Sequence, residues 1–508
     1  MAARRVRRIL PIVVATFTTL AAVLSAEDFR VTLQAAASLH GAPPTFFRSD
    51  VSVFNGSGQN ETVVTATYRC GAESCGDAVQ TFTIPPRQVR AFPDIVGTLF
   101  HAPETFGAIE FDSQTIIVVT SRLSSLEPSE PSIGMFVPGL KPEDAHPSLA
   151  LTSLSHSAGA MSGFRTNVGV YNPQDVSQPV LFSFFEASGV FLGNLFEVVD
   201  ARRPLQLNDG DIFRRLDVAG DVRDFYCLVT GDGVHPLYAY ASVIDRRSQD
   251  PIFIRGEDAA GLRVSKVTLP AAASLRGAAG TFFHSDARIW NASATAFTNV
   301  TARYLCFTAG CGDAEQSFLV APHQMLVLDD VVASLFHASG TGGAIEFVSE
   351  QPLVVTSRLY TPDRSEPTLG MFVPALAPAR AAPAIVMNGL SHPASSASGV
   401  RVNVGVFNET STPQVVTYRL FDGAGNRIGQ TSRYFAGREA FQINDIFAFL
   451  GISAAVESAY CLVEGSEGLS LFAYAAVINN RSQDPIFVPG EDDPEKPPIV
   501  PLTLAGSR

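Results

Sequence analysis

The chain has 508 residues, of which 46% are hydrophobic and 17% are charged, and its formal net charge is −13. This composition excludes extensive disorder for the bulk of the chain, and the length requires several domains, because single hydrophobic cores stop growing at roughly 250 to 300 residues. The negative charge repels phosphate groups, so nucleic acid is not an expected partner.

The N-terminal segment 1–26 has the charged, apolar and small-residue order of a secretory signal peptide. Four arginines precede an apolar run from Ile9 to Leu24, and Ser25-Ala26 stands before Glu27. A membrane anchor is the alternative, but the run is shorter than the roughly 20 clean apolar residues of a membrane span, and no later stretch approaches one. We therefore expect cleavage near Ala26 and a secreted or cell-surface protein. A periplasmic location is the alternative.

The rest of the chain is an internal duplication. The segment VTLQAAASLHGAPPTFF, which begins at Val31, returns as VTLPAAASLRGAAGTFF, which begins at Val267. The same spacing of 236 residues separates Cys70 from Cys306. Repeats of this kind indicate one structural unit that has been copied.

Each half is itself a pair of related modules. The strand-like segment that ends at Asn55 resembles the one that ends at Asn172, and the corresponding segments end at Asn291 and Asn408. We place four modules at 30–141, 145–256, 264–378 and 382–490, and we expect them to be independent beads joined by linkers. Residues 491–508 are acidic and then proline-rich, which predicts a disordered tail.

Within a module the hydrophobic pattern alternates with a period of two, which is typical of β-strands. In the first module we expect strands near 31–39, 50–55, 62–69, 78–84, 108–111, 116–122 and 133–137. Short strands at this density, separated by glycine, proline and asparagine turns, predict a β-sandwich. The fold class is therefore all-β, with four tandem immunoglobulin-like β-sandwich modules.

Two recurring positions have structural explanations. The asparagine that ends each V-x-V-x-N strand is expected to tolerate a left-handed backbone in the following turn. An aspartate precedes a short apolar stretch in every module, and we expect it to cap the N-terminus of one or two helical turns. These aspartates are Asp94, Asp211, Asp330 and Asp445.

The strand-then-asparagine pattern, the T-V-x-T-x-Y type of strand after it and the Phe-Val-Pro ending at Pro138 and Pro374 resemble immunoglobulin-like or fibronectin-type repeats of bacterial secreted and surface proteins. The resemblance covers nearly all of the chain after residue 26. It implies a role as a spacer, adhesin stalk or binding module, and it carries over no functional residue. Antibody domains have a core of two paired cysteines and a tryptophan. Trp290, the only tryptophan here, has no such cysteine pair, so the strand topology stays open.

The six cysteines are of two kinds. Cys70 and Cys75, and likewise Cys306 and Cys311, flank a short turn between two expected strands, so each pair is expected to form a disulfide in an oxidising compartment. Cys227 and Cys461 lie alone on equivalent strands, and we expect them to be buried free thiols. A Cys227–Cys461 bridge is the alternative, and it would require modules 2 and 4 to touch.

No motif for catalysis, metal binding or phosphate binding occurs in the sequence, so no cofactor is expected. Odd and even modules differ, however, at two places. Odd modules have Thr-Ser-Arg at Arg122 and Arg358, and only even modules have Arg-Ser-Gln-Asp-Pro, beginning at Arg247 and Arg481. These arginines are candidates to line a binding site at module junctions, although strand-end and turn chemistry explains them as well.

The first functional hypothesis is a non-enzymatic extracellular scaffold or adhesin-like protein that presents loops to a protein or glycan. A carbohydrate- or protein-binding array is the second hypothesis, and it requires exposed aromatic platforms, for which Tyr360, Phe54 and Trp290 are candidates. A secreted hydrolase with an active site assembled from distant loops is the third. The oligomeric state is left open by the sequence.

Overall fold

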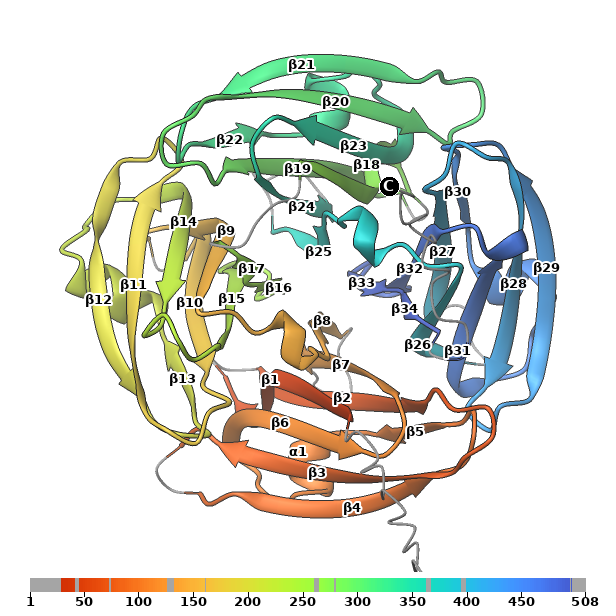
Figure 1. The fold of residues 1–508 in the computed structure, drawn as a ribbon, viewed down its shortest axis with the longest axis horizontal. Helices are drawn as coiled ribbons and strands as arrows, with labels where there is room; N and C mark the ends of the chain where they lie inside the picture. The colour runs from red at the N-terminus through yellow and green to blue at the C-terminus, as the bar shows by residue number, and fades with distance from the viewer. Residues whose placement is uncertain are drawn as a thin grey trace, which may run out of the picture.

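The computed structural model describes residues 29–41, 45–72, 75–125, 132–159, 161–259, 265–277, 280–361, 367–393, 399–493 and 495. The expected signal peptide and most of the expected tail lie outside the described residues. The fold is all-β, and the four β-sandwich modules follow one another around a closed ring (Figure 1).

Modules 1 and 3 share one layout. Module 1 consists of β1 (Phe29–His40), β2 (Phe46–Asn55), β3 (Thr62–Cys70), β4 (Ala78–Ile84), β5 (Val89–Phe92), α1 (Ile95–Thr98), β6 (Thr105–Ser113), β7 (Ile117–Ser125) and β8 (Ile133–Pro138). Module 3 consists of β18 (Lys266–Arg276), β19 (Phe282–Asn291), β20 (Thr298–Cys306), β21 (Ala314–Val320), β22 (Met325–Leu328), α3 (Val331–Ser334), β23 (Thr341–Ser349), β24 (Leu353–Thr361) and β25 (Leu369–Pro374).

Modules 2 and 4 share a second layout. Module 2 consists of β9 (Ser148–His156), β10 (Phe164–Tyr171), β11 (Gln178–Glu186), β12 (Phe191–Val199), β13 (Pro204–Leu207), α2 (Asp209–Arg215), β14 (Val222–Thr230), β15 (Tyr238–Asp245), β16 (Pro251–Arg255) and β17 (Glu257–Asp258). Module 4 consists of β26 (Ala384–His392), β27 (Val400–Asn408), β28 (Gln414–Asp422), β29 (Arg427–Phe435), β30 (Ala440–Ile443), α4 (Ile446–Phe449), β31 (Val456–Gly465), β32 (Leu471–Asn479), β33 (Pro485–Pro489) and β34 (Glu491–Asp492). Short 3-10 turns, η1 (Pro142–Asp144) and η3 (Pro378–Arg380), join odd to even modules, and η4 (Ser466–Gly468) lies within module 4.

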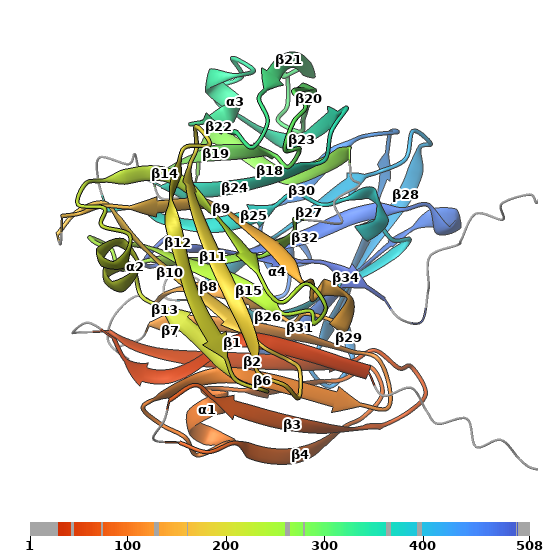
Figure 2. The ribbon, with the colours of Figure 1, turned by 60° about the vertical axis from the view of Figure 1, so that its left-hand side comes forward.

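Each module has two layers of strands, and the strand orders run from the perimeter of the ring toward its centre (Figure 1). In modules 2 and 4 these are separate sheets, with the orders β12-β11-β14-β9-β17 and β13-β10-β15-β16 in module 2. In module 1 the first strand bends at a bulge between Leu33 and Ala36 and pairs with both β6 and β2, which joins the two layers into one sheet. The outermost strands β4, β12, β21 and β29 lie on the perimeter of the ring (Figure 1), and Figure 2 shows the sandwiches from the side.

The asparagine that ends the second strand of each module is a buried anchor. The Asn55 side chain is fully buried, and its Nδ2 donates to the carbonyl oxygens of Asn60, Ile84 and Pro85 at 2.8, 3.0 and 3.2 Å. Asn291 makes the same three contacts in module 3. None of these asparagines has a positive φ in the described chain, so the expected left-handed turn was wrong. The asparagine is required because its amide satisfies buried carbonyl groups.

Three of the four expected helix caps stand at the N-cap position. Asp94, Asp330 and Asp445 each have a positive φ and accept a hydrogen bond from the backbone N–H three residues ahead. Asp211 was wrong as a cap, because helix α2 begins earlier, with Asn208 at its N-cap, and Asp211 lies inside the helix. The two residues that module 2 has in addition at this point lengthen the helix.

Modules within each half share apolar surface. Tyr240 and Phe253 of module 2 pack into the core of module 1, and Tyr474 and Phe487 of module 4 pack into the core of module 3. The buried Glu110 carboxylate adds ion pairs across the first of these junctions. It lies 3.0 Å from Arg202 of module 2 and 2.9 Å from Arg69 of its own module.

A second type of junction joins the two halves. Tyr226 of module 2 packs against Trp290 of module 3, and its hydroxyl donates to the His323 carbonyl oxygen at 2.7 Å. Module 4 makes the corresponding contact with module 1: Tyr460 packs against Phe54, and its hydroxyl donates to the Arg87 carbonyl oxygen at 3.0 Å. The contact between modules 2 and 3 is thus repeated between modules 4 and 1, which closes the ring.

The expectation of independent beads was therefore wrong. Residues 491–493, which were expected to be disordered, help to close the ring as well. Strand β34 pairs with β26 of its own module. This pairing is followed by Asp493, which forms the contact between modules, an ion pair with Arg87 of module 1 at 2.7 Å. Module 2 likewise continues to β17, beyond its expected end at residue 256.

The repeated junction predicts the behaviour of half the chain. A fragment of residues 265–495 is expected to fold and to form a dimer, because the Tyr460 surface of one copy can cover the Trp290 surface of the other, as Tyr226 does in the full chain. Light scattering after size exclusion measures the mass. Trp290→Arg in the fragment should give a folded monomer, since a buried charge disfavours the interface. A wild-type fragment that is a stable monomer would contradict the proposed equivalence of the two junctions.

Candidate functional site

The last long strand of every module runs toward the centre of the ring. Strands β8, β16, β25 and β33 meet there around a cavity of about 90 Å³. Its walls are largely apolar and include Phe136, Phe253, Phe372 and Phe487. The centre is thus a packed interior with little room for a ligand.

The Arg-Ser-Gln-Asp-Pro turns of the even modules dock onto the odd modules at this centre. Asp250 Oδ2 accepts a hydrogen bond from the Gly370 N–H at 2.7 Å, and Asp484 Oδ2 accepts one from the Gly134 N–H at 2.9 Å. The serines of the same turns add hydrogen bonds, from Ser248 Oγ to the Thr368 carbonyl oxygen and from Ser482 Oγ to the Ser132 carbonyl oxygen. These turns therefore join neighbouring modules.

The docked turns and the odd-module residues that they contact form a central cluster. Two of the four candidate arginines, Arg122 and Arg358, belong to it. Arg358 donates to Thr368 Oγ1 at 3.0 Å and lies 3.9 Å from Asp250, and Arg122 donates to Ser132 Oγ at 3.1 Å. The other two, Arg247 and Arg481, lie within the turns. Arg247 is 3.6 Å from Asp245, and Arg481 is exposed. The differences between odd and even modules are thus complementary halves of one buried contact.

The centre also holds a pair of buried carboxyl groups, which no sequence motif indicates. Asp250 and Asp484 are fully buried and interact through their side chains, and the raised pKa of each favours the protonated form. Burial, together with the charge of Asp484, raises the pKa of Asp250 well above its usual range. Burial raises the pKa of Asp484 to about 7, against the opposing effect of the Arg122 charge.

A larger opening, the junction cleft, lies between modules 3 and 4 and has a volume of about 820 Å³. Module 3 contributes the aromatic residues Phe282, Phe283 and Phe307, and module 4 contributes polar side chains and one tyrosine, which are Arg401, Asn403, Gln442, Asn444, Asp445 and Tyr474. A volume of this size is in the range of roughly 300 to 1,000 Å³ found for small-molecule sites.

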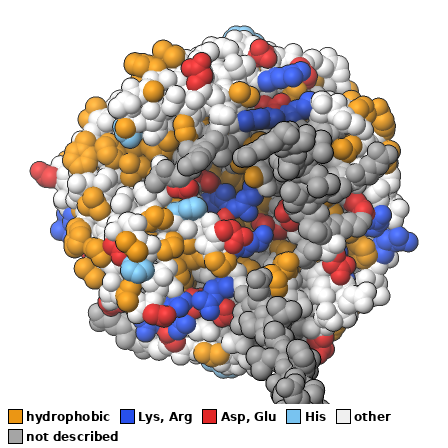
Figure 3. All heavy atoms as spheres, viewed as in Figure 1, with side chains coloured by type: hydrophobic (Ala, Val, Ile, Leu, Met, Phe, Trp, Pro, Cys, Tyr) orange, Lys and Arg blue, Asp and Glu red, His pale blue; other side chains and the backbone are white. Residues whose placement is uncertain are grey.

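Charged side chains gather near the centre of one face of the ring (Figure 3), where a depression of about 450 Å³ lies next to η1 and η3. Arg255 pairs with Glu257 at 2.8 Å, and Arg380 pairs with Asp144. These four side chains are therefore engaged with each other within the protein. In the described part of the chain, no group of three or more histidine, cysteine or acidic side chains is placed to hold a metal ion.

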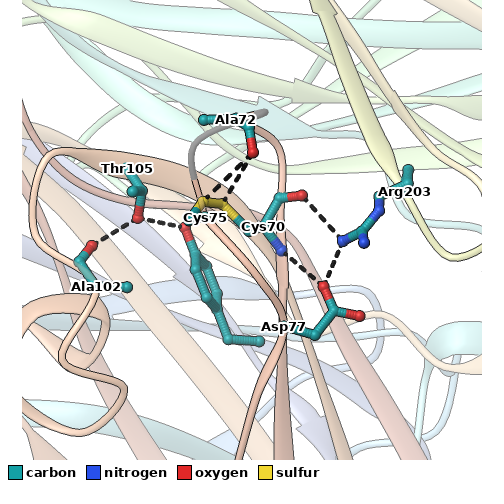
Figure 4. Close-up of a disulfide and its surroundings, with 8 residues drawn as sticks. Cys70, Ala72, Cys75, Asp77, Ala102, Thr105 and Arg203 are labelled. Carbon is teal, nitrogen blue, oxygen red and sulfur yellow. Dashed lines mark hydrogen bonds and ion pairs between the residues drawn. A yellow bond between two sulfur atoms is a disulfide. The ribbon is translucent and has the colours of Figure 1, made fainter.

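The structure contains both expected disulfides, Cys70–Cys75 and Cys306–Cys311. The first lies at the junction with module 2 (Figure 4): Arg203 donates to the Cys70 carbonyl oxygen at 3.2 Å and pairs with Asp77. Cys227 and Cys461 are fully buried free thiols. Burial raises the pKa of both thiols, to about 12 for Cys461.

The three aromatic residues considered as ligand platforms are instead buried at junctions and at the centre. Phe54 and Trp290 lie under Tyr460 and Tyr226, and Tyr360 stacks near Arg358. The structure also assembles a buried cluster that sequence spacing did not reveal, in which Asp209 contacts His156 at 2.9 Å and Arg246 at 2.8 Å. These three residues come from distant parts of module 2, so no local motif could indicate their contact.

No known protein family matches the chain, and no curated protein matches it. Among solved structures, one similar chain is described as "Crystal structure of tetra-tandem repeat in extending region of large adhesion protein". It shares 11% sequence identity, and the match covers 90% of this chain and 97% of that chain. The TM-score is 0.10, so this likeness carries no argument about function.

The carboxyl pair predicts a pH dependence of stability. A raised pKa means that the folded state retains a proton that the unfolded chain has released. The contribution of this proton to the free energy of unfolding is therefore complete below pH 4 or so, and it is lost as the pH rises through about 7. Asp484→Asn keeps a neutral side chain and should reduce the loss of Tm between pH 5 and pH 8. Thermal melts across this range measure the effect. Asp217→Asn, at an exposed site, is the control, and an equal pH slope in all three proteins would contradict the raised pKa of Asp484.

The cysteines predict a modest response to reduction. Closing so short a loop contributes on the order of 2 kcal/mol per bridge in the chain-entropy model, so reduction should lower the Tm without unfolding the ring. Cys227 and Cys461 should react with a maleimide only after denaturation, because their thiols are buried and protonated. Non-reducing peptide mapping checks the pairing. A peptide that links Cys227 to Cys461 would contradict it.

Proposed function

We propose that the chain is a non-enzymatic scaffold or adhesin-like protein that works outside the cell and binds an extracellular glycan or protein. The observation that carries this proposal is the closed ring. Its junctions hold four sandwiches in fixed relative positions, and such rigidity suits a surface that must present a preformed site to a partner.

The location outside the cell is supported by the disulfides and by the N-terminal segment. Both disulfides are of the kind that persists in oxidising compartments, and they are rare in the cytosol. No helix in the described part of the chain is long and apolar enough to cross a membrane. The signal-like segment before Glu27 is consistent with export.

The closed ring favours a binding role over a role as an extended spacer. An extended stalk would expose the faces that carry Phe54 and Trp290, whereas here both residues are buried against another module. We therefore place the function in a site that the ring presents, and the junction cleft is the candidate.

The test is an array experiment with the chain from residue 27 onward. We expect saturable binding to at least one extracellular glycan or protein, with no turnover of the bound molecule over hours. Incubation with chromogenic glycoside, ester and peptide substrates tests the non-enzymatic part. Turnover of any of these would contradict the proposal, and so would a lack of binding to every array member.

A further inference from the structure

The junction cleft has two walls of different chemistry, and this combination points to one class of ligand. One wall comes from module 3 and presents phenylalanine rings, whereas the other comes from module 4 and presents amide groups. The cleft exists only because the two modules are fixed against each other.

On the module 4 wall, a chain of hydrogen bonds orients the amides. The hydroxyl of buried Tyr474 donates to Gln442 Oε1 at 2.9 Å, and Gln442 Nε2 donates to Asn444 Oδ1 at 2.8 Å. Asn403 Oδ1 accepts a hydrogen bond from the Asp445 N–H at 3.0 Å. Each asparagine thus uses its oxygen within the protein, which directs its amide N–H groups as donors to a ligand.

The charged groups of the same wall are occupied by the protein. Arg401 donates to Asn480 Oδ1 at 2.8 Å and to Gln483 Oε1 at 3.0 Å, and Asp445 Oδ1 accepts a hydrogen bond from the Ala448 N–H as a helix cap. A strongly charged ligand would therefore have to compete with these bonds. A ligand with neutral hydroxyl groups would not, since the amides can serve it directly.

The module 3 wall offers mainly apolar surface, together with one exposed arginine, Arg276. Phe282 and Phe307 are only partly buried and line the cleft together with Gly277 and Gly340. Aromatic rings bury the apolar faces of amphipathic molecules well, and a sugar ring has such a face between its hydroxyl groups. From these two walls we infer that the junction cleft binds a neutral oligosaccharide, with Phe282 and Phe307 against its sugar rings and Asn403 and Asn444 donating to its hydroxyl groups. This inference rests on the proposed function.

The experiment uses the chain from residue 27 and a panel of malto-, cello-, xylo-, chito- and galacto-oligosaccharides of two to six sugars. Isothermal titration calorimetry gives the Kd of each. We expect one series to bind, and we expect Phe282→Ala on one wall and Asn444→Ala on the other each to weaken it by about tenfold or more, which corresponds to about 1.4 kcal/mol.

Tyr434→Ala and Gln430→Ala are matched controls, because they remove an aromatic ring and an amide from exposed positions on β29, at the ring perimeter. Both should keep the wild-type Kd, and thermal melts should show that all four variants are folded. An oligosaccharide that binds equally well to all variants would overturn the assignment to the cleft but leave the proposed function standing. Binding of a protein alone would have the same consequence, whereas a failure to bind anything on the panel or the arrays would overturn both.

Discussion

The architecture depends on one repeated contact, in which a tyrosine of an even module covers an aromatic residue of the next odd module. Tyr226 on Trp290 joins the halves along the chain, and Tyr460 on Phe54 joins the end of the chain to its beginning. A head-to-tail contact generates either an open filament or a closed ring, depending on its rotation. Here the two kinds of junction together complete one full turn in four modules, so the surfaces that carry Phe54 and Trp290 are both covered.

Ring closure explains why polar groups are retained at the centre. Arg358, Asp250 and their counterparts Arg122 and Asp484 are removed from water, which is costly unless each charge finds partners. An apolar centre would tolerate several relative positions of four similar modules. The central hydrogen bonds, from Gly370 to Asp250 and from Gly134 to Asp484, are satisfied in only one arrangement. We interpret the cluster as the element that sets the register of the ring.

Much of the fold could be predicted from the sequence, because it depends on local pattern. The alternation of apolar residues indicated the strands, the duplication indicated the modules, and the short Cys70–Cys75 and Cys306–Cys311 spacings indicated the disulfides. The ring could not be predicted, because a buried aromatic residue such as Trp290 has the same strand context whether it faces its own core or another module. The odd and even signatures around Arg122 and Arg247 were visible, but their contact depends on how modules pack. The walls of the junction cleft come from two different modules, and only the packing of module 3 against module 4 brings them together.

The contact between modules 2 and 3 at the centre and the contact between modules 4 and 1 place equivalent residues together, but the hydrogen-bonding groups differ. Asp245 can only accept hydrogen bonds, and Thr368 donates to it through both its backbone N–H and its hydroxyl. At the equivalent place in the other half, Asn479 donates to Ser132, which also accepts from Arg122. The hydrogen bond has reversed direction, and a second carboxylate equivalent to that of Asp245 has been avoided near the Asp250–Asp484 pair. Since each further buried carboxylate would make the protons of this pair harder to release and the centre costlier to ionise, the exchange of aspartate for asparagine limits the charge that the ring must bury.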